Sequence, residues 1–250
     1  MGEKRIIETF DLTKYYNGQA AVHKLNLHVK EGEVFGFLGP NGSGKTTTLL
    51  MLLGLSSPSE GRALVCGLDP AKDSRKIKAR VGYLPENVGF YTDLDAVQTL
   101  DFIADLNGIP ADEAERRIQE VLELVGLKKE ARKKVGAYSR GMKQRLGIAE
   151  VLIKNPSVLF LDELTLGLDP EGATKLVDLI AQLNQDKGMT VLLSSHNLYQ
   201  VQRICNRVGI MINGKMVAQG SMEQLAEERL GIGDKEYSLE EIYLRYFQES

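Results

Sequence analysis

The chain has 250 residues, of which 43% are hydrophobic, and this is enough for a globular protein with a sizeable core. Lysine and arginine number 31 against 34 aspartate and glutamate, so the formal charge of −3 excludes an overall basic excess of the kind that indicates nucleic-acid binding. Cys66 and Cys205 are too few for a disulfide framework, and no apolar run reaches the ~20 residues that cross a bilayer.

No hydrophobic signal-peptide core follows Met1, so we expect the chain to remain in a reducing cytoplasm. A role at a membrane would then require a partner that supplies the membrane spans. The sequence contains no internal repeat and no low-complexity linker.

The first 85 residues are predicted to form mainly short strands with two helices. Strands at residues 5–10 and 22–29 surround a turn at 15–18, which predicts an antiparallel hairpin. The elements that follow are an apolar strand at 34–38, a helix at 48–53, a strand at 62–66, a charged helix at 73–80 and a strand at 81–84 that Pro85 ends.

Strands cease between residues 95 and 155, where the pattern is helical. Within residues 111–127, one helical face carries the apolar side chains of Ala114, Ile118, Val121, Leu122 and Val125. This pattern predicts a helical subdomain inserted in an α/β core.

The α/β alternation resumes at residues 157–161, a nearly continuous apolar run that is typical of a buried parallel strand. An amphipathic helix at 238–247 either docks on the body of the protein, which we favour, or meets a partner. Between these two lie a helix at 171–186, a strand at 190–193, a helix at 197–206, a strand at 208–212, a turn at Asn213-Gly214 and a strand at 215–218.

The loop between the strand at 34–38 and the next helix has the spacing G-x-x-x-x-G-K-[ST]. Its backbone N–H groups and the positive end of the helix dipole point at one spot, which suits an anion. Lys45 is expected to reach the β- and γ-phosphates of a nucleotide, and the Thr46 hydroxyl to bind Mg²⁺. A chance glycine-rich turn is the alternative. The expected nucleotide-binding residues of this loop are Gly39, Pro40, Asn41, Gly42, Ser43, Gly44, Lys45, Thr46 and Thr47.

Two acidic residues, Asp162 and Glu163, follow the buried strand at its carboxyl end, the edge at which open α/β sheets bind ligands. Asp162 is expected to hold Mg²⁺ through water, and Glu163 to orient or deprotonate the water that attacks the γ-phosphate. A solvated, charged strand end is the alternative, and the phosphate loop upstream makes the catalytic interpretation the better one.

Together these motifs resemble those of the ATP-binding cassette subunit of ABC transporters, and the resemblance covers nearly the whole chain. It implies an α/β fold with a mostly parallel P-loop NTPase core, an N-terminal antiparallel β subdomain and an inserted α-helical subdomain. By this resemblance, residues 1–87 and 156–230 form the ATP-binding core, residues 88–155 the helical signature subdomain and residues 231–250 a C-terminal helical tail.

Residues 138–142 resemble the signature motif LSGGQ, in which Ser139 and Gly141 would bind the γ-phosphate held by another subunit. Asp169 lies in a segment similar to the D-loop, which crosses between subunits. As isolated patterns, the first would be a helix cap and the second a turn before a helix.

His196 resembles the switch histidine that contacts the γ-phosphate, although a lone histidine at a strand end would more often be a hydrogen-bonded structural residue. Tyr16 resembles the aromatic residue that stacks on adenine, with Tyr15 as a less well aligned rival.

Several residues depart from the family pattern. Glu86 stands where the Q-loop has glutamine, and it could still contact the metal; Arg140, Met142 and Leu164 replace a glycine, a glutamine and a proline. Arg140 either places a positive charge near the γ-phosphate in trans or faces solvent. The departures at Glu86 and Arg140 resemble exporter cassettes that pair with separate membrane subunits.

The resemblance implies an ATPase, with ATP and Mg²⁺ as cofactors, that dimerises head to tail with a second copy or a related cassette. Lys45, Glu163 and His196 would carry catalysis. An integral membrane permease subunit would dock in a groove between Glu86 and Ser139, at the cytoplasmic face of the cell membrane, with the chain peripheral and no nucleic acid bound.

The same residues disfavour two rival functions. A soluble ABC-type ATPase of nucleic acid, ribosome or cluster assembly is disfavoured by the single cassette and by the short gap between Glu86 and Ser139. A regulator that binds nucleotide without hydrolysis is disfavoured by the intact Lys45, Asp162 and Glu163.

Overall fold

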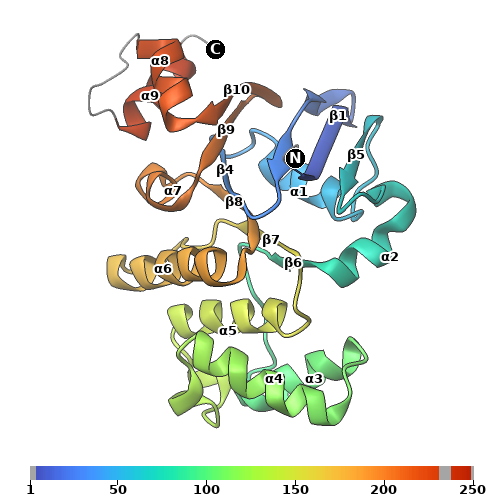
Figure 1. The fold of residues 1–250 in the computed structure, drawn as a ribbon, viewed down its shortest axis with the longest axis vertical. Helices are drawn as coiled ribbons and strands as arrows, with labels where there is room; N and C mark the ends of the chain where they lie inside the picture. Colours follow the sequence, from blue (N-terminus) through green and yellow to red (C-terminus); the bar gives the residue numbers. More distant parts are fainter. Residues whose placement is uncertain (1–3, 231–237, 249–250) are drawn as a thin grey trace.

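Figure 1 shows the fold in a computed structural model, which describes residues 4–230 and 238–248. An antiparallel sheet from the N-terminal part of the chain lies beside a mixed sheet, and helices cover the mixed sheet. The expected residues 231–237 and 249–250 of the C-terminal tail lie outside the described residues.

The antiparallel sheet is built around β1 (Arg5–Tyr16), which pairs with each of the other strands. These are β2 (Gln19–Leu25), β3 (His28–Lys30) and β5 (Glu60–Val65). The β1–β2 pair is the predicted hairpin, with a tight turn at Asn17-Gly18.

The mixed sheet has the strand order β10-β9-β4-β8-β7-β6, and all its neighbours are parallel except β9 and β10. Parallel strands place their carboxyl ends at one edge, so the segments after β4, β6, β7 and β8 meet there. The strands are β4 (Val34–Leu38), β6 (Val81–Leu84), β7 (Val158–Asp162), β8 (Thr190–Ser195), β9 (Arg207–Ile212) and β10 (Lys215–Ser221).

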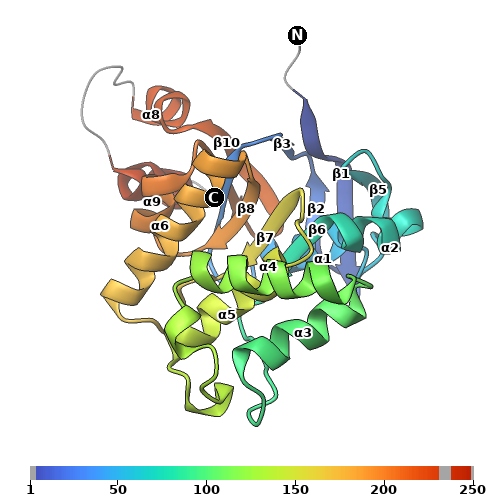
Figure 2. The ribbon, with the colours of Figure 1, turned by 60° about the horizontal axis from the view of Figure 1, so that its bottom comes forward.

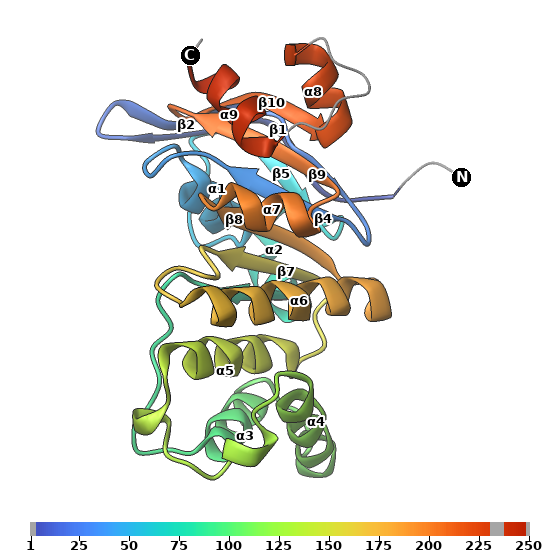
Figure 3. The same cartoon turned by 90° about the vertical axis from the view of Figure 1, so that its left-hand side faces the viewer.

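The central strands are buried on both faces, as their continuous apolar runs predict. In β7, Val158 and Phe160 join the core between the two sheets, whereas Leu159 and Leu161 join the core on the opposite face. This second core is covered by α5 (Arg140–Leu152) and α6 (Pro170–Lys187), which run side by side (Figure 3).

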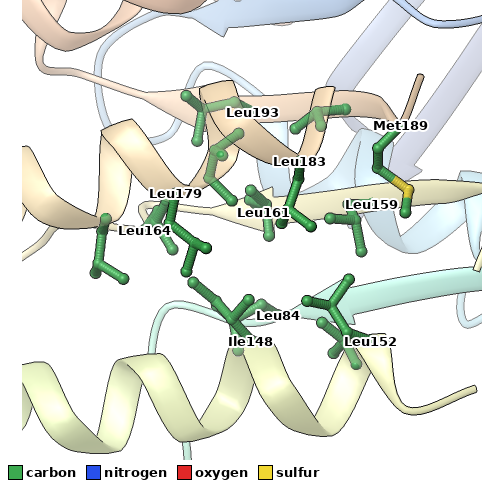
Figure 4. Close-up of a cluster of buried hydrophobic side chains, with 14 of the residues drawn as sticks. Leu84, Ile148, Leu152, Leu159, Leu161, Leu164, Leu179, Leu183, Met189 and Leu193 are labelled. Carbon is green, nitrogen blue, oxygen red and sulfur yellow. The ribbon is translucent and has the colours of Figure 1, made fainter. Parts of the chain in front are cut away.

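Figure 4 shows how α5 packs against the mixed sheet and α6. Ile148 and Leu152 of α5 point toward Leu84, Leu159 and the side chains of α6. The predicted helical subdomain contains α3 (Ala96–Leu106) and α4 (Ala111–Leu124) in addition to α5, and Figure 2 shows the three helices grouped in front of the parallel strands. The remaining helices are α1 (Lys45–Leu52), α2 (Pro70–Arg80), α7 (Leu198–Ile204), α8 (Met222–Leu230) and α9 (Leu239–Gln248).

The amphipathic helix near the C-terminus docks on the body, as favoured from the sequence. Leu239, Ile242 and Tyr246 of α9 are buried against α7 and α8. Phe247, which shares the predicted apolar face, is instead about half exposed.

Some sequence-based boundaries are wrong. The strand expected at 22–29 is divided between β2 and β3, because β1 bends and pairs with each in turn. The turn expected at 15–18 is confined to its last two residues, since Tyr15 and Tyr16 pair in β1. Helix α8 was not predicted, and α2 begins at Pro70, where Asp69 caps it, rather than at residue 73.

Among residues 4–230 and 238–248, no helix combines the length and the apolar character that crossing a membrane requires.

The packing of α7 on β4 leads to a stability prediction. A Cβ at Gly36 would lie 2.5 Å from Cγ1 of the buried Val201. We expect Gly36→Ala to lower the free energy of unfolding by about 1–3 kcal/mol through overpacking, measured by urea denaturation.

Gly89→Ala is the matched control, because a Cβ at Gly89 meets nothing within 4 Å. Its unfolding midpoint should equal that of the parent protein. Equal midpoints for the two variants would contradict the packing described here.

Candidate active site

The loop of residues 39–47 curves from the end of β4 into α1 and requires glycine at two close approaches. A Cβ at Gly39 would lie 2.2 Å from the carbonyl oxygen of Met211, and one at Gly44 only 2.4 Å from that of Ala21. Gly44 also has φ of 104° and caps α1. The loop therefore brings its backbone within reach of an anion at the start of the helix.

Lys45 curls over this loop. Its Nζ donates hydrogen bonds to the carbonyl oxygens of Gly39 at 2.8 Å and Pro40 at 3.2 Å, and only 6% of the residue is exposed. Burial lowers the pKa of Lys45, while the carboxylates of Glu163 and Asp162 act in the opposite direction. An anion bound in the loop would add to the negative charge that these carboxylates provide for the buried ammonium.

Asp162 links three elements at the edge of the sheet. One carboxylate oxygen accepts a hydrogen bond from Thr46 Oγ1 at 2.9 Å, and the other accepts one from Ser194 Oγ. Asp162 is 3% exposed. The structure thus places two of the three expected metal ligands, Thr46 and Asp162, in contact. The third, Glu86, lines the same pocket as Thr46.

Glu163 has the unusual backbone conformation of a non-glycine residue with positive φ, 49°. Its Oε2 lies 2.7 Å from Nδ1 of His196. Because an ionised carboxylate can only accept, Nδ1 of His196 carries the proton in this contact. The other oxygen, Oε1, is buried without a hydrogen-bond partner and lies 4.0 Å from Lys45 Nζ.

Lys45, Thr46 and Glu163 line one pocket of about 270 Å³. Glu86, which follows β6, lines the same pocket as the loop and Glu163. The lining residues are Ala21, Asn41, Gly42, Gly44, Lys45, Thr46, Thr47, Glu86 and Glu163.

The residues present fit a magnesium nucleotide. The hydroxyl of Ser43 and Oε1 of Glu163 are both buried without hydrogen-bond partners, as expected of groups that await phosphate and water. Within the described part of the chain, no cluster of three or more His, Cys, Asp or Glu side chains forms a metal site alone. Mg²⁺ commonly uses one or two carboxylates and takes its other ligands from phosphates and water, so Asp162 and Thr46 suffice on the protein side.

Nine predicted site residues are not in the lining of this pocket. Gly39, Pro40 and Ser43 belong to the loop, Asp162 contacts Thr46, and His196 contacts Glu163. The other four come from other segments of the chain: Tyr16, Ser139, Gly141 and Asp169. Ser139 and Asp169 are exposed N-caps of α5 and α6, where they accept hydrogen bonds from Met142 N and Gly172 N. Exposed caps of this kind can still meet a ligand held by another molecule.

Tyr16 is 47% exposed, with the Lys14 ammonium 5.1 Å from its ring centre and its hydroxyl 3.5 Å from Ser56 Oγ. Tyr15 is also exposed, and only its backbone N–H is held, by Ser59 Oγ at 3.1 Å. Both rings are thus accessible to a flat ligand.

The sequence did not point to two residues that interact with Asp162, namely Ser194 and Tyr83. Ser194 donates a hydrogen bond to the Asp162 carboxylate. The pair of serines that ends β8 was the feature of the sequence that could have indicated it. Burial, and secondarily the charge of Asp162, raises the pKa of Tyr83 to about 12. No pattern in the sequence marks Tyr83.

Comparisons with known proteins match this chain to one family. A profile of the family described as "ABC transporter" matches residues 22–166. The bacitracin transport ATP-binding protein BcrA of Bacillus licheniformis is 44% identical over 220 residues, which are 88% of this chain and 71% of that protein. The linearmycin resistance ATP-binding protein LnrL of Bacillus subtilis is 37% identical over 226 residues, 90% of this chain and 72% of that protein.

Solved structures give the same result. The ATP-binding subunit of an ABC transporter superposes with a TM-score of 0.86 at 28% identity, covering 97% of this chain and 99% of that one. The ATP-binding cassette MJ0796, solved as a dimer with ADP and Pi after hydrolysis, has a TM-score of 0.77 at 25% identity and covers 86% of this chain and 98% of that one.

The close approach at Gly44 gives a binding prediction. We expect Gly44→Ala to weaken ATP binding by about tenfold or more, because the added Cβ would collide with the Ala21 carbonyl and strain the loop. Titration with a fluorescent ATP analogue measures the Kd.

Gly108→Ala serves as the control, since Gly108 also has positive φ, 66°, but a Cβ there meets nothing within 4 Å. It should keep the parent Kd. A Gly44→Ala variant that binds ATP as tightly as Gly108→Ala would show that the loop is not built as described.

Proposed function

Since this chain belongs to the ATP-binding subunits of ABC transporters, we propose that Glu163 and His196 hydrolyse MgATP at the pocket beside α1 and that a second chain completes the site. The chain is an ATPase of this family that powers transport, and its relatives include proteins named for bacitracin transport and for linearmycin resistance. The observation that carries the proposal is the buried carboxylate of Glu163. Its Oε2 contacts His196, whereas its Oε1 has no hydrogen-bond partner and lies next to Lys45.

The residues of this chain divide the chemistry as follows. Lys45 exchanges its contacts with two loop carbonyls for the phosphates, where its charge offsets that which develops during transfer. Asp162 and Thr46 would hold Mg²⁺, which neutralises phosphate charge when bound, and Glu86 lines the same cavity.

Glu163 orients the attacking water or accepts its proton through the free Oε1, while His196 holds Oε2. The water oxygen forms a bond to the γ-phosphorus as the bond to the β–γ bridging oxygen breaks. The positive φ of Glu163 fits this role, because backbone strain of this kind gathers at functional sites.

The second chain would supply Ser139, Gly141 and Asp169, which are absent from the pocket lining of their own chain. The N-terminus of α5 is open there, since a Cβ at Gly141 would meet only Leu168 Cδ2, at 3.9 Å. Backbone N–H groups at such a terminus bind anions, so a γ-phosphate held by the partner fits. Adenine would stack on Tyr16.

The membrane subunit would dock on the opposite side of β6. A groove of about 380 Å³ lies where the end of α1 meets α3 and α5, and most of its exposed lining is apolar, including Leu55, Ile103 and Val151 beside Tyr83. The polar lining residues are Lys78, Asn107, Glu150 and Lys154. Leu55 is 55% exposed, and the rest of α3 adds the exposed Leu106. An apolar helix face from a membrane protein fits this surface, which would place the chain at the cytoplasmic face of the membrane.

Tyr83 connects the groove with the ATP site. It lines the groove and is close enough to Asp162 for that carboxylate to raise its pKa. Docking in the groove is therefore in a position to affect the residue that would hold the metal.

The catalytic proposal is tested by Glu163→Gln. We expect turnover to fall by ~10²–10⁴, the contribution of a general base, while the Kd for ATP stays within about threefold. Steady-state phosphate release and nucleotide titration measure the two quantities. Glu115→Gln, an exposed carboxylate on α4, is the control and should keep both values. Near-normal turnover of Glu163→Gln would refute the assignment.

The docking proposal is tested by Leu55→Asp. A charge in the apolar groove should reduce the amount of chain that co-purifies with native membranes by about tenfold, whereas ATP binding is unchanged. Leu244→Asp changes a comparably exposed leucine on α9 and should leave membrane recovery unaltered. Equal recovery of both variants, or recovery with ribosomes or DNA instead, would contradict a membrane partner at this groove.

A further inference from the structure

Arg140, which departs from the family's signature motif, makes a contact within its own chain that neither sequence-based interpretation anticipated. A Cβ placed on Gly167 would lie 2.5 Å from both Cζ and Nη1 of Arg140 and 3.0 Å from Nε. The guanidinium therefore lies against the α carbon of Gly167, in the loop between β7 and α6. Gly167 has φ of 70°, which favours glycine, and a Cβ there would displace the guanidinium.

This contact has a neighbour that makes it part of an interface. Leu168 Cδ2 would be 3.9 Å from a Cβ on Gly141, so the loop meets the first turn of α5 at two consecutive residues. Helix α5 belongs to the helical subdomain, and the loop joins β7 of the mixed sheet to α6 (Figure 3). The two parts of the fold thus touch through the signature turn as well as through their apolar core.

The position of Arg140 does not serve helix stability. A positive charge in the first turn opposes the helix dipole, and α5 begins with Arg140 and Lys143 but no acidic residue. Within the described residues, Arg140 also forms no hydrogen bond or ion pair that would compensate it. What the structure records for its guanidinium is the close approach to Gly167, at an exposed position.

The loop leads directly to the catalytic carboxylate. Leu166 N donates to the Glu163 carbonyl at 3.0 Å, and Leu168 N donates to the Thr165 carbonyl at 3.2 Å. These two turns connect Glu163 with Gly167, which lies four positions further along the chain. A displacement at Gly167 would therefore change the backbone that holds Glu163 in its strained conformation.

We propose that Arg140 is a positioning residue that fixes the β7–α6 loop through its planar contact with Gly167, and so couples movement of the helical subdomain to Glu163 of the same chain. Its effect on turnover rests on the proposed function of Glu163, whereas its effect on the loop does not. A charge role toward a phosphate in trans is the competing explanation.

Substitutions at both ends of the contact separate the two explanations. In the full chain, Arg140→Ala and Gly167→Ala should each lower kcat by about tenfold with KM for ATP changed less than about threefold, and the double variant should lose little more than either alone. Arg140→Lys keeps the charge but not the planar group, so it should not restore kcat. Arg75→Ala, at an exposed arginine of α2, is the control.

A second measurement is independent of catalysis. Hydrogen exchange of the peptide covering residues 163–169 should become about tenfold faster in nucleotide-free Arg140→Ala than in Arg75→Ala, because the loop loses its contact with α5. Unchanged exchange, independent effects of the two substitutions on kcat, or rescue by Arg140→Lys would each overturn the proposal. If loop exchange changes but Glu163→Gln remains active, the contact stands and the role of Glu163 fails.

Discussion

The buried carboxylate of Asp162 is the interaction on which the rest of the site depends. It accepts hydrogen bonds from Thr46 of α1 and Ser194 of β8, and so joins the phosphate loop to two strands of the sheet. A carboxylate that is 3% exposed needs such partners, because a buried charge without them is costly. With this edge held, Lys45 and Glu163 lie next to each other in the lining of one pocket, with Nζ and Oε1 4.0 Å apart.

The same arrangement leaves the site open on one side. The groups that contact the pocket come from the loop, β2, the segment after β6 and the end of β7, whereas the signature residues cap α5 at a separate place. The unpartnered oxygens of Ser43 and Glu163 indicate what is still needed: phosphate, water and a second surface. The proposed function of this chain is thus closure between two molecules. In this proposal, docking in the groove beside β6 acts on Asp162 through Tyr83, and the contact of Arg140 with Gly167 acts on Glu163.

Much of the fold could be predicted from local patterns. The continuous apolar runs of β4 and β7 identify buried parallel strands, and the glycine spacing of residues 39–47 identifies the phosphate loop. The division of residues 22–29 into two strands could not be predicted, because it depends on the bend of β1. Helix α8 has only a weak amphipathic pattern and depends on packing against α9 and β10. Within the site, the motifs marked Lys45, Glu86 and Glu163, which the structure brings to one pocket. The roles of Ser194 and Tyr83 and the contact between Arg140 and Gly167 arise from tertiary neighbours that no spacing reveals.

The central claim, that one nucleotide site is shared by two chains, is tested most directly by mixing two inactive variants. Lys45→Ala removes the phosphate lysine, and Ser139→Ala removes the signature hydroxyl. In a head-to-tail dimer of one of each, both defects fall in one site and the other site is intact. The account predicts that the mixture recovers ATPase activity well above that of either variant alone. Activity equal to the average of the two separate variants would contradict it and would mean that each chain hydrolyses ATP with its own residues.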